Sequence, residues 1–366
     1  MNSLLQKSIY SFLIFLLTIH LDTLSAKGIE YNKYLNLAQK DKERLIKKYV
    51  KKPKNGFYNV AISNYDVYCD ISAAKTLQMT IMMDSFYNRF SSIFTGKFKL
   101  SSRPKLYILK NNQAYAKAIN NYTKGVIDAG WSIGMYITYG NSKSALFANQ
   151  EKGDKDVQRI LFHEGTHQLL HYYTGSRQIP TWFNEGMATN FETWQIERSV
   201  QNNISNNLYE TSRRHSIANS YPNNGYVPFN TLFNISSSQW SQSPNPTNNY
   251  ASAWVSINAM LSNQKGKSFF NTMVSGLKAG KKSTSIMSSK TRANFNEFLK
   301  KHITSTVIPY QQYALKIENA FKEGKRQQAT ELVSNYYSKH PESPYAQYYL
   351  HANSIMEGKK VKESLS

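Results

Sequence analysis

The sequence predicts an α+β fold, in which a lobe built on a mixed sheet precedes a mainly helical lobe. Strand-like and helix-like segments interleave as far as residue 150, whereas helical patterns dominate from residue 154 onward. Hydrophobic residues form 40% of the 366-residue chain, which is typical of globular proteins and argues against wholesale disorder. We therefore expect one large domain over residues 55–305, with an α+β lobe at 55–150 and a helical lobe at 151–305.

The first 26 residues have the pattern of a secretory signal peptide. Lys7 precedes an apolar run over residues 9–21, and Ala26 is a small residue at a plausible cleavage point. The run is shorter than the roughly 20 residues that a membrane-spanning helix needs. We predict that residues 1–26 are cleaved and that the protein is exported to the periplasm, the cell envelope or the medium. A retained N-terminal anchor is the alternative.

The chain is strongly basic, with 45 Lys and Arg against 23 Asp and Glu. Loss of residues 1–26 would remove one Lys and one Asp, so the net charge would stay at +22. Such an excess attracts polyanions. The basic residues form only short clusters, and no nucleic-acid-binding motif accompanies them. We therefore expect association with anionic cell-envelope material rather than specific binding of nucleic acid.

Cys69 is the only cysteine, which excludes an intramolecular disulfide. It lies in an apolar and aromatic stretch, where a lone cysteine usually behaves as a small core residue. We expect Cys69 to be buried, and we expect stability to come from packing and from a bound metal.

The α+β lobe is expected to follow a leader helix and linker over the lysine-rich residues 27–54. Residues 57–71 alternate as a strand does, and Ser72 can cap the next helix. That helix has apolar side chains at spacings of three and four, namely Met79, Met82, Phe86 and Phe90. The remaining predicted elements are strands at 105–110, 131–140 and 144–150 and a helix at 111–121, with a turn at Gly140 and Asn141.

The helical lobe should open with two consecutive helices. Asp154 is a candidate N-cap of the first helix, and Gly175 is expected to end it. Pro180 should open the second, which we expect to run to Glu197. Asn, Ser and Pro are frequent in the following segment, which predicts a loop. The expected elements after Glu197 are a loop at 201–249 apart from 228–233, a helix at 250–261, and further helical segments at 266–304.

The last segment, residues 306–366, contains a short repeat. The heptapeptide NAFKEGK at 319–325 recurs as NSIMEGK at 353–359, a period of 34 residues. This period resembles that of tetratricopeptide repeats. One and a half repeats cannot form a stable solenoid, so we expect a helical tail that packs on the helical lobe and offers a surface to a protein partner. An ordinary helical hairpin is the alternative.

The strongest chemical pattern is His163-Glu164-Gly165-Thr166-His167. Positions i and i+4 of a helix lie on one face about one turn apart, so the two imidazoles can bind the same Zn²⁺. Glu164 falls beside them, where it can act on a metal-bound water without being a ligand. The pattern predicts a metal site with His163 and His167 as ligands and Glu164 as general base.

A catalytic zinc needs a third protein ligand and one open position. Glu185 is the predicted ligand, because a helix, a short turn and a returning helix would bring it back against the two histidines. His171, one turn beyond His167, is the rival. On a straight helix it neighbours His167 and is poorly placed to complete a triangle of ligands.

These segments resemble the gluzincin metallopeptidases of the aminopeptidase N-like (peptidase MA) clan, and most of all its uncharacterised bacterial peptidase-like families. The similar segments are HEGTHQLL at 163–170, PTWFNEGMATNFE at 180–192, PFNTLFNISSSQW at 228–240 and YASAWVSINAML at 250–261. The resemblance extends over about residues 55–265. It implies a zincin-like two-lobed domain with Glu185, in the pattern Trp-x-Asn-Glu-Gly, as the third ligand. It also implies that Tyr250, at the start of a helix, faces the metal and stabilises the oxyanion. Tyr226 and His215 are the alternatives.

The sequence departs from the clan at two places. The nearest equivalent of the clan's amine-recognising Gly-x-Met-Glu-Asn element is residues 132–136, which contain no acidic residue, so an endopeptidase is expected. The Asp that often orients a histidine four residues past the third ligand is Thr189 here. Glu192, two turns beyond Glu185, can take that role by contacting a ligand.

The expected protein is therefore an endopeptidase that binds one Zn²⁺ per chain and hydrolyses protein or peptide substrates, with Glu164 as general base. Zinc is preferred to Mn²⁺ or Co²⁺ from the ligand types alone. One alternative is a zinc amidase or other hydrolase that acts on a non-protein envelope polymer. Another is a non-catalytic protein that binds partners through its basic surface and its tail. A structural zinc site would normally be closed by a fourth ligand, and the sequence offers none at this spacing.

Overall fold

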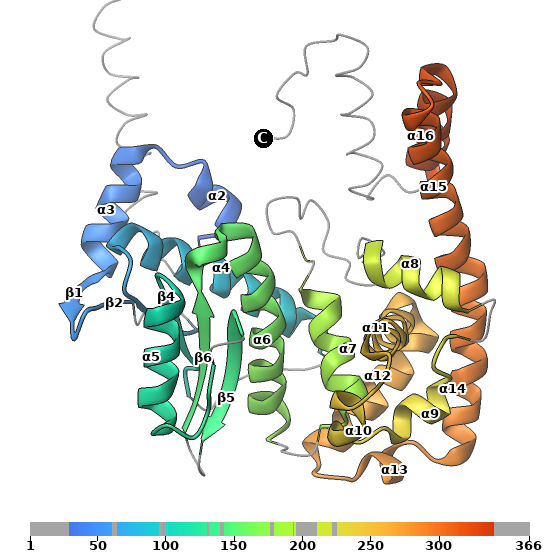
Figure 1. Ribbon diagram of the computed structural model, residues 1–366, viewed down its shortest axis with the longest axis horizontal. Coiled ribbons are helices and arrows are strands. Elements are labelled where there is room, and N and C mark those ends of the chain that lie inside the picture. The colour runs from blue at the N-terminus through green and yellow to red at the C-terminus, as the bar shows by residue number, and fades with distance from the viewer. Residues whose placement is uncertain are drawn as a thin grey trace, which may run out of the picture. The chain divides into compact units, whose positions relative to one another are not determined.

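The computed structural model contains a six-stranded mixed sheet and many helices (Figure 1). The chain divides into two compact units, and the division falls inside one long helix, between Leu161 and Phe162. Residues 94–99 belong to the second unit. The residues that the structure describes are 29–60, 64–94, 98, 100, 102–129, 132–139, 143–175, 179–192, 194, 211–221 and 225–339.

The first unit is built on the sheet, whose strand order is β1-β2-β3-β4-β6-β5. The central strands β3, β4 and β6 run parallel, whereas β1, β2 and β5 pair antiparallel with their neighbours. This is the mixed sheet that the sequence predicts. The strands are β1 (Lys51–Lys54), β2 (Phe57–Val60), β3 (Asp66–Cys69), β4 (Lys105–Leu109), β5 (Gly134–Tyr139) and β6 (Lys143–Asn149).

The segment at 57–71 contains strand, as predicted, and forms the two antiparallel strands β2 and β3. One expectation for this unit was wrong. Residues 51–54, expected as a linker, form the exposed strand β1. Pro53 cannot donate a ladder hydrogen bond, and an edge strand is one of the few sheet positions that tolerates this. Cys69 is fully buried, as predicted.

Helices cover the sheet of the first unit. Ser72 caps α4, as predicted, since its side chain accepts a hydrogen bond from the Lys75 backbone N–H. Asn111 caps α5 in the same way. The long helix α6 is tied to α4 by a salt bridge of 2.8 Å between Lys75 Nζ and Asp154 Oδ1. The helices are α2 (Tyr31–Leu35), α3 (Gln39–Tyr49), α4 (Ala73–Ser92), α5 (Asn112–Thr123) and α6 (Asp154–Thr174), of which the part from Phe162 onward belongs to the second unit.

The second unit is helical in the described residues. Its helices after α6 are α7 (Thr181–Phe191), α8 (Thr211–Ser220), α9 (Phe229–Asn234), α10 (Ser237–Ser241), α11 (Pro246–Ser262), α12 (Gln264–Lys278), α13 (Ser283–Ile286), α14 (Ser289–His302), α15 (Ile308–Lys322) and α16 (Arg326–Lys339), with a π-helical segment η5 (Ile303–Val307) between α14 and α15. None of the helices in the described part of the chain is long and apolar enough to cross a membrane. The predicted signal peptide lies outside the described residues.

Three boundaries in this unit differ from the sequence expectation. The second helix of the motif region, α7, ends at Phe191 rather than at Glu197, and residues 195–197 lie outside the described part. The helix expected at 250–261 begins at Pro246, because Asn245 caps it and proline is suited to its first turn. The segment expected as a loop also contains α8 and α10, whose polar sequences carry no clear helical periodicity.

The packing of α7 against α11 depends on Gly186. A Cβ atom placed on Gly186 would lie 2.6 Å from the carbonyl oxygen of Ala253, which is too close for any side chain. Asn190 also joins the two helices, since its Nδ2 donates to the Trp254 carbonyl at 2.9 Å. The close approach brings the residue before Gly186, Glu185, near the first turns of α11.

The tail begins as a helical hairpin. Helix α15 ends at Lys322, and Gly324 follows with φ +70°, a left-handed conformation that favours glycine. Helix α16 then packs back on α15, with a ring-centroid distance of 5.3 Å between Tyr310 and Tyr336. The second copy of the predicted repeat, residues 353–359, lies outside the described residues.

His302 links α14 to α11 and makes stability depend on pH. It is buried, and its Nε2 lies 2.9 Å from Asn258 Oδ1. Burial lowers its pKa to about 4, from an ordinary value near 6.5. The folded protein thus binds fewer protons than the unfolded chain, so stability is full above about pH 6.5 and falls between about pH 6.5 and 4.

We expect His302 to contribute a loss of about 2–3 kcal/mol in the free energy of unfolding between pH 7 and pH 4.5. Urea unfolding of the wild type and of His302→Gln at these two pH values measures this loss. Glutamine is a suitable replacement because it can hydrogen-bond Asn258 but does not titrate. The variant should lose correspondingly less stability on acidification. Equal losses in the two proteins would exclude His302 as the cause.

Candidate metal centre

The two motif histidines lie on one face of α6. His163 and His167 are one turn apart, and their ring centroids are 4.9 Å apart with the rings nearly perpendicular. Neighbouring apolar side chains of this helix are fully buried and hold it in place, among them Leu161, Phe162, Leu169 and Leu170. The imidazoles therefore point from a fixed helix toward a common position.

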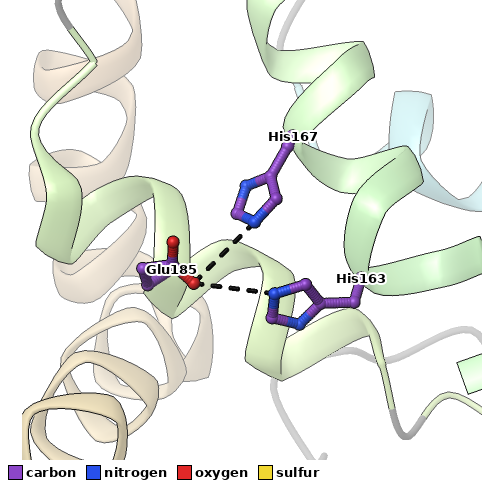
Figure 2. A group of neighbouring side chains, drawn as sticks. All are labelled: His163, His167 and Glu185. Atoms are coloured by element: carbon purple, nitrogen blue, oxygen red, sulfur yellow. Dashed lines mark ion pairs between the residues drawn. The ribbon is translucent and has the colours of Figure 1, made fainter. Parts of the chain in front are cut away.

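Helix α7 brings the third residue to the same position. Gly175, with φ +61°, ends α6, and Pro180 precedes α7, both as predicted. Glu185 on α7 faces the two histidines, and its Oε2 lies 3.6 Å from His163 Nε2 and 3.8 Å from His167 Nε2 (Figure 2). The structure thus brings together the three predicted ligands. His171 is not part of this cluster in the described residues.

The geometry suits a metal ion better than a hydrogen-bonded triad. Distances of 3.6 and 3.8 Å are too long for strong hydrogen bonds. Ligand atoms that each lie about 2.0–2.1 Å from a tetrahedral zinc are separated by roughly 3.4 Å. Glu185 Oε2 is buried and has no hydrogen-bond partner among the described residues. An ion at the centre would satisfy this oxygen, so the residues present fit zinc.

Glu192 orients one of the two histidines. It follows the last residue of α7, its side chain is only 10% exposed, and its Oε2 lies 2.8 Å from His163 Nδ1. An Nδ1–H that donates to this carboxylate leaves Nε2 free to face Glu185. Thr189 cannot do this, because its hydroxyl donates to the Glu185 carbonyl of its own helix. Glu192, seven residues past Glu185, therefore contacts a ligand histidine, as the sequence analysis suggested.

The electrostatics of the cluster depend on these carboxylates. Burial on its own would lower the pKa of His163. The carboxylates of Glu185 and Glu192, with a contribution from Glu164, outweigh burial and raise that pKa to about 10. Burial likewise opposes ionisation of Glu185, but the nearby His167 and His163 hold its pKa below the ordinary value. The cluster is therefore an electronegative site suited to a cation.

Glu164 lies next to His163 on α6 and is half-buried. Its charge acts on His163, so the carboxylate is close to the ligand cluster. It is not one of the three converging ligand residues. This position is compatible with the predicted general base.

Tyr250 reaches the site from the second turn of α11. Its ring packs edge-on against Trp240, at a centroid distance of 5.2 Å, and beneath the guanidinium of Arg213, at 5.1 Å. Burial and the negative charge of Glu185 raise the pKa of Tyr250 above its ordinary value near 10. The phenol therefore stays protonated at neutral pH and can donate a hydrogen bond.

The two alternatives to Tyr250 have other surroundings. His215 is exposed, with Nε2 at 2.8 Å from Asn219 Nδ2 and Nδ1 at 3.4 Å from Gln311 Nε2. Tyr226 is buried and packs against Tyr221 at a centroid distance of 5.5 Å. No hydrogen bond or ion pair in the described residues joins either side chain to the three ligands.

Arg213 is a residue of the site that the sequence did not predict. Its Nη2 lies 3.7 Å from Glu192 Oε1, and its guanidinium covers the Tyr250 ring. No local pattern marks it, because it lies in the Asn-rich segment that was expected to be a loop. Only the position of α8 brings it to the site.

The sequence matches no protein-family model and no curated protein. The resemblance to gluzincins therefore rests on the motif residues of the sequence alone.

Proposed function

We propose that the protein is a zinc-dependent metallopeptidase of the gluzincin type that acts as an endopeptidase. The observation that carries this proposal is the convergence of His163 Nε2, His167 Nε2 and Glu185 Oε2, with Glu164 beside them. Three ligands from two helices leave one position open, as catalytic zinc sites require and structural sites do not. The resemblance of the motif segments to the aminopeptidase N-like clan supports the same assignment.

The chain's own residues supply the proton transfers. A zinc ion held by the three ligands would act as a Lewis acid that lowers the pKa of a water and polarises the substrate carbonyl. Glu164 accepts a proton from the attacking water and returns it to the leaving nitrogen. Tyr250 donates a hydrogen bond to the oxyanion that develops on the carbonyl. Glu192 keeps the His163 ring in the ligating orientation.

The division of the chain into two units supports the expectation of a domain with two lobes, since the mixed sheet belongs to one unit and the ligand-bearing helix α7 to the other. The pattern of residues 1–26 supports export. The absence of an acidic residue at 132–136 supports internal cleavage over removal of N-terminal residues, since nothing there would bind a free amine.

Metal analysis combined with a protease assay tests the proposal. We expect about one zinc per chain, and cleavage of casein or of a peptide library at internal bonds. A chelator should abolish this cleavage and added zinc should restore it. A zinc-loaded protein that cleaves neither casein nor the library would refute the peptidase assignment.

One observation favours a second candidate. The net charge of +22 suits an anionic polymer better than an average protein substrate. The same site could hydrolyse amide bonds in the cell envelope. Release of amines from isolated anionic cell-wall material, without cleavage of casein, would identify such an amidase.

Replacement of Tyr250 by Phe tests the oxyanion donor. Removal of such a donor costs about 10²–10³ in kcat, because its hydrogen bond is strongest in the transition state. We expect Tyr250→Phe to lose rate on that scale and to retain zinc and a near-normal KM. Tyr226→Phe is the matched control and should keep the wild-type rate. A kcat for Tyr250→Phe within about threefold of wild type would exclude the role and direct attention to His215.

A further inference from the structure

Arg213 connects two residues of the proposed site. Its Nη2 is 3.7 Å from Glu192 Oε1, while the other oxygen of that carboxylate is 2.8 Å from His163 Nδ1. The Arg213 guanidinium also lies 5.1 Å from the centroid of the Tyr250 ring. A planar guanidinium can pair with a carboxylate and stack on an aromatic ring at the same time, which a lysine ammonium does less well. Arg213 thus restrains both neighbours.

The next residue along α8 holds the helix from another direction. Arg214 is fully buried, and its Nε donates to Gln311 Oε1 at 2.6 Å. Its guanidinium lies 4.7 Å from the centroid of the Tyr310 ring. Both partners belong to α15. Successive residues of a helix point about 100° apart, so Arg213 and Arg214 can face different neighbours.

We propose that Arg213 is a positioning residue of the metal site, which holds Glu192 against His163, and that α15 keeps Arg213 in place through Arg214. This inference rests on the proposed metal function. It extends the site to α15, where Gln311 lies 97 positions along the chain from Arg214. The C-terminal tail then contributes to the geometry of the site.

A double-mutant cycle on zinc affinity tests the role of Arg213. Zinc Kd is measured by competition with a chromophoric chelator for wild type, Arg213→Met, Glu192→Gln and the double variant. We expect Arg213→Met to raise Kd by at least about fivefold more in the wild-type background than in the Glu192→Gln background. The direct repulsion between Arg213 and a dication is present in both backgrounds, so the cycle cancels it. Arg326→Met, which removes an exposed guanidinium on α16, is the control and should show no such difference.

The role of α15 is tested at Gln311 by a neutral variant and by a variant that keeps the acceptor. Gln311→Met removes the acceptor for Arg214 and should weaken zinc binding by about threefold or more in the wild type, but not in Glu192→Gln. Gln311→Glu keeps the acceptor and should stay within about twofold of wild type. If Gln311→Met does not fold, as judged by circular dichroism, Tyr310→Leu replaces it, because it removes the ring beside Arg214 and keeps an apolar side chain.

Additive effects of Arg213→Met and Glu192→Gln, within about twofold, would overturn the positioning role. Unchanged zinc affinity in the folded α15 variant would overturn the part played by the tail. These results are independent of turnover. A protein that binds zinc with the expected coupling but cleaves no substrate would disprove the peptidase function and leave the positioning inference intact.

Discussion

We expect His163→Ala, His167→Ala and Glu185→Ala each to reduce the zinc content from about one per chain to about a tenth or less after dialysis. Each substitution leaves two protein ligands, which hold zinc poorly, and hydrolytic activity should fall to background with the metal. Atomic absorption or mass spectrometry measures the zinc, and circular dichroism checks that the variants stay folded. Glu185→Ala also removes the negative charge that lies beside the imidazoles of His163 and His167.

His171→Ala is the matched control, because it removes an imidazole from the next turn of the same helix. The structure places His171 outside the ligand cluster, so this variant should keep full zinc and activity. Stoichiometric zinc in His167→Ala together with loss of zinc in His171→Ala would reverse the assignment. That result would mean that the metal is bound by a different pair of histidines from the one that the motif predicts.

The ligand positions could be predicted because they depend on local rules. The spacing of His163 and His167 follows from the helical repeat alone. The position of Glu185 could be predicted because Gly175 ends one helix and Pro180 begins the next. The short turn between them brings the second helix back toward the first. Gly186 belongs to the sequence pattern around Glu185. The structure gives the reason for glycine at this position, since any side chain there would prevent α7 from packing against α11.

The parts that could not be predicted depend on packing between distant segments. Helix α8 has no hydrophobic periodicity, and it is held by packing against α11 and by buried contacts such as that between Arg214 and Gln311. The local sequence therefore predicts neither this helix nor the position of Arg213 on it. Strand β1 was misread for a similar reason, since its exposed lysines resemble a linker and only pairing with β2 makes it a strand. Glu192 could be suggested from the sequence, but its contact with His163 required the end of α7 to be known.

Glu164→Gln separates catalysis from metal binding. Glutamine has almost the shape of glutamate but cannot accept a proton at neutral pH, so the general base is lost while the three ligands stay in place. We expect kcat to fall by about 10²–10⁴, with about one zinc per chain retained. Because Glu164 is half-buried beside His163 and is not a ligand, zinc affinity should change far less than in the ligand variants.

Glu192→Gln is the informative comparison for Glu164→Gln, since each removes one carboxylate charge near His163. Loss of Glu192 acts through the orientation of a ligand, so it should weaken zinc binding by about 10–100-fold and lower activity mainly at limiting zinc. Loss of Glu164 should lower activity equally at saturating zinc. If excess zinc restored Glu164→Gln to the wild-type rate, Glu164 would be supporting the ligands rather than moving the proton, and the general base would have to be sought elsewhere in the site.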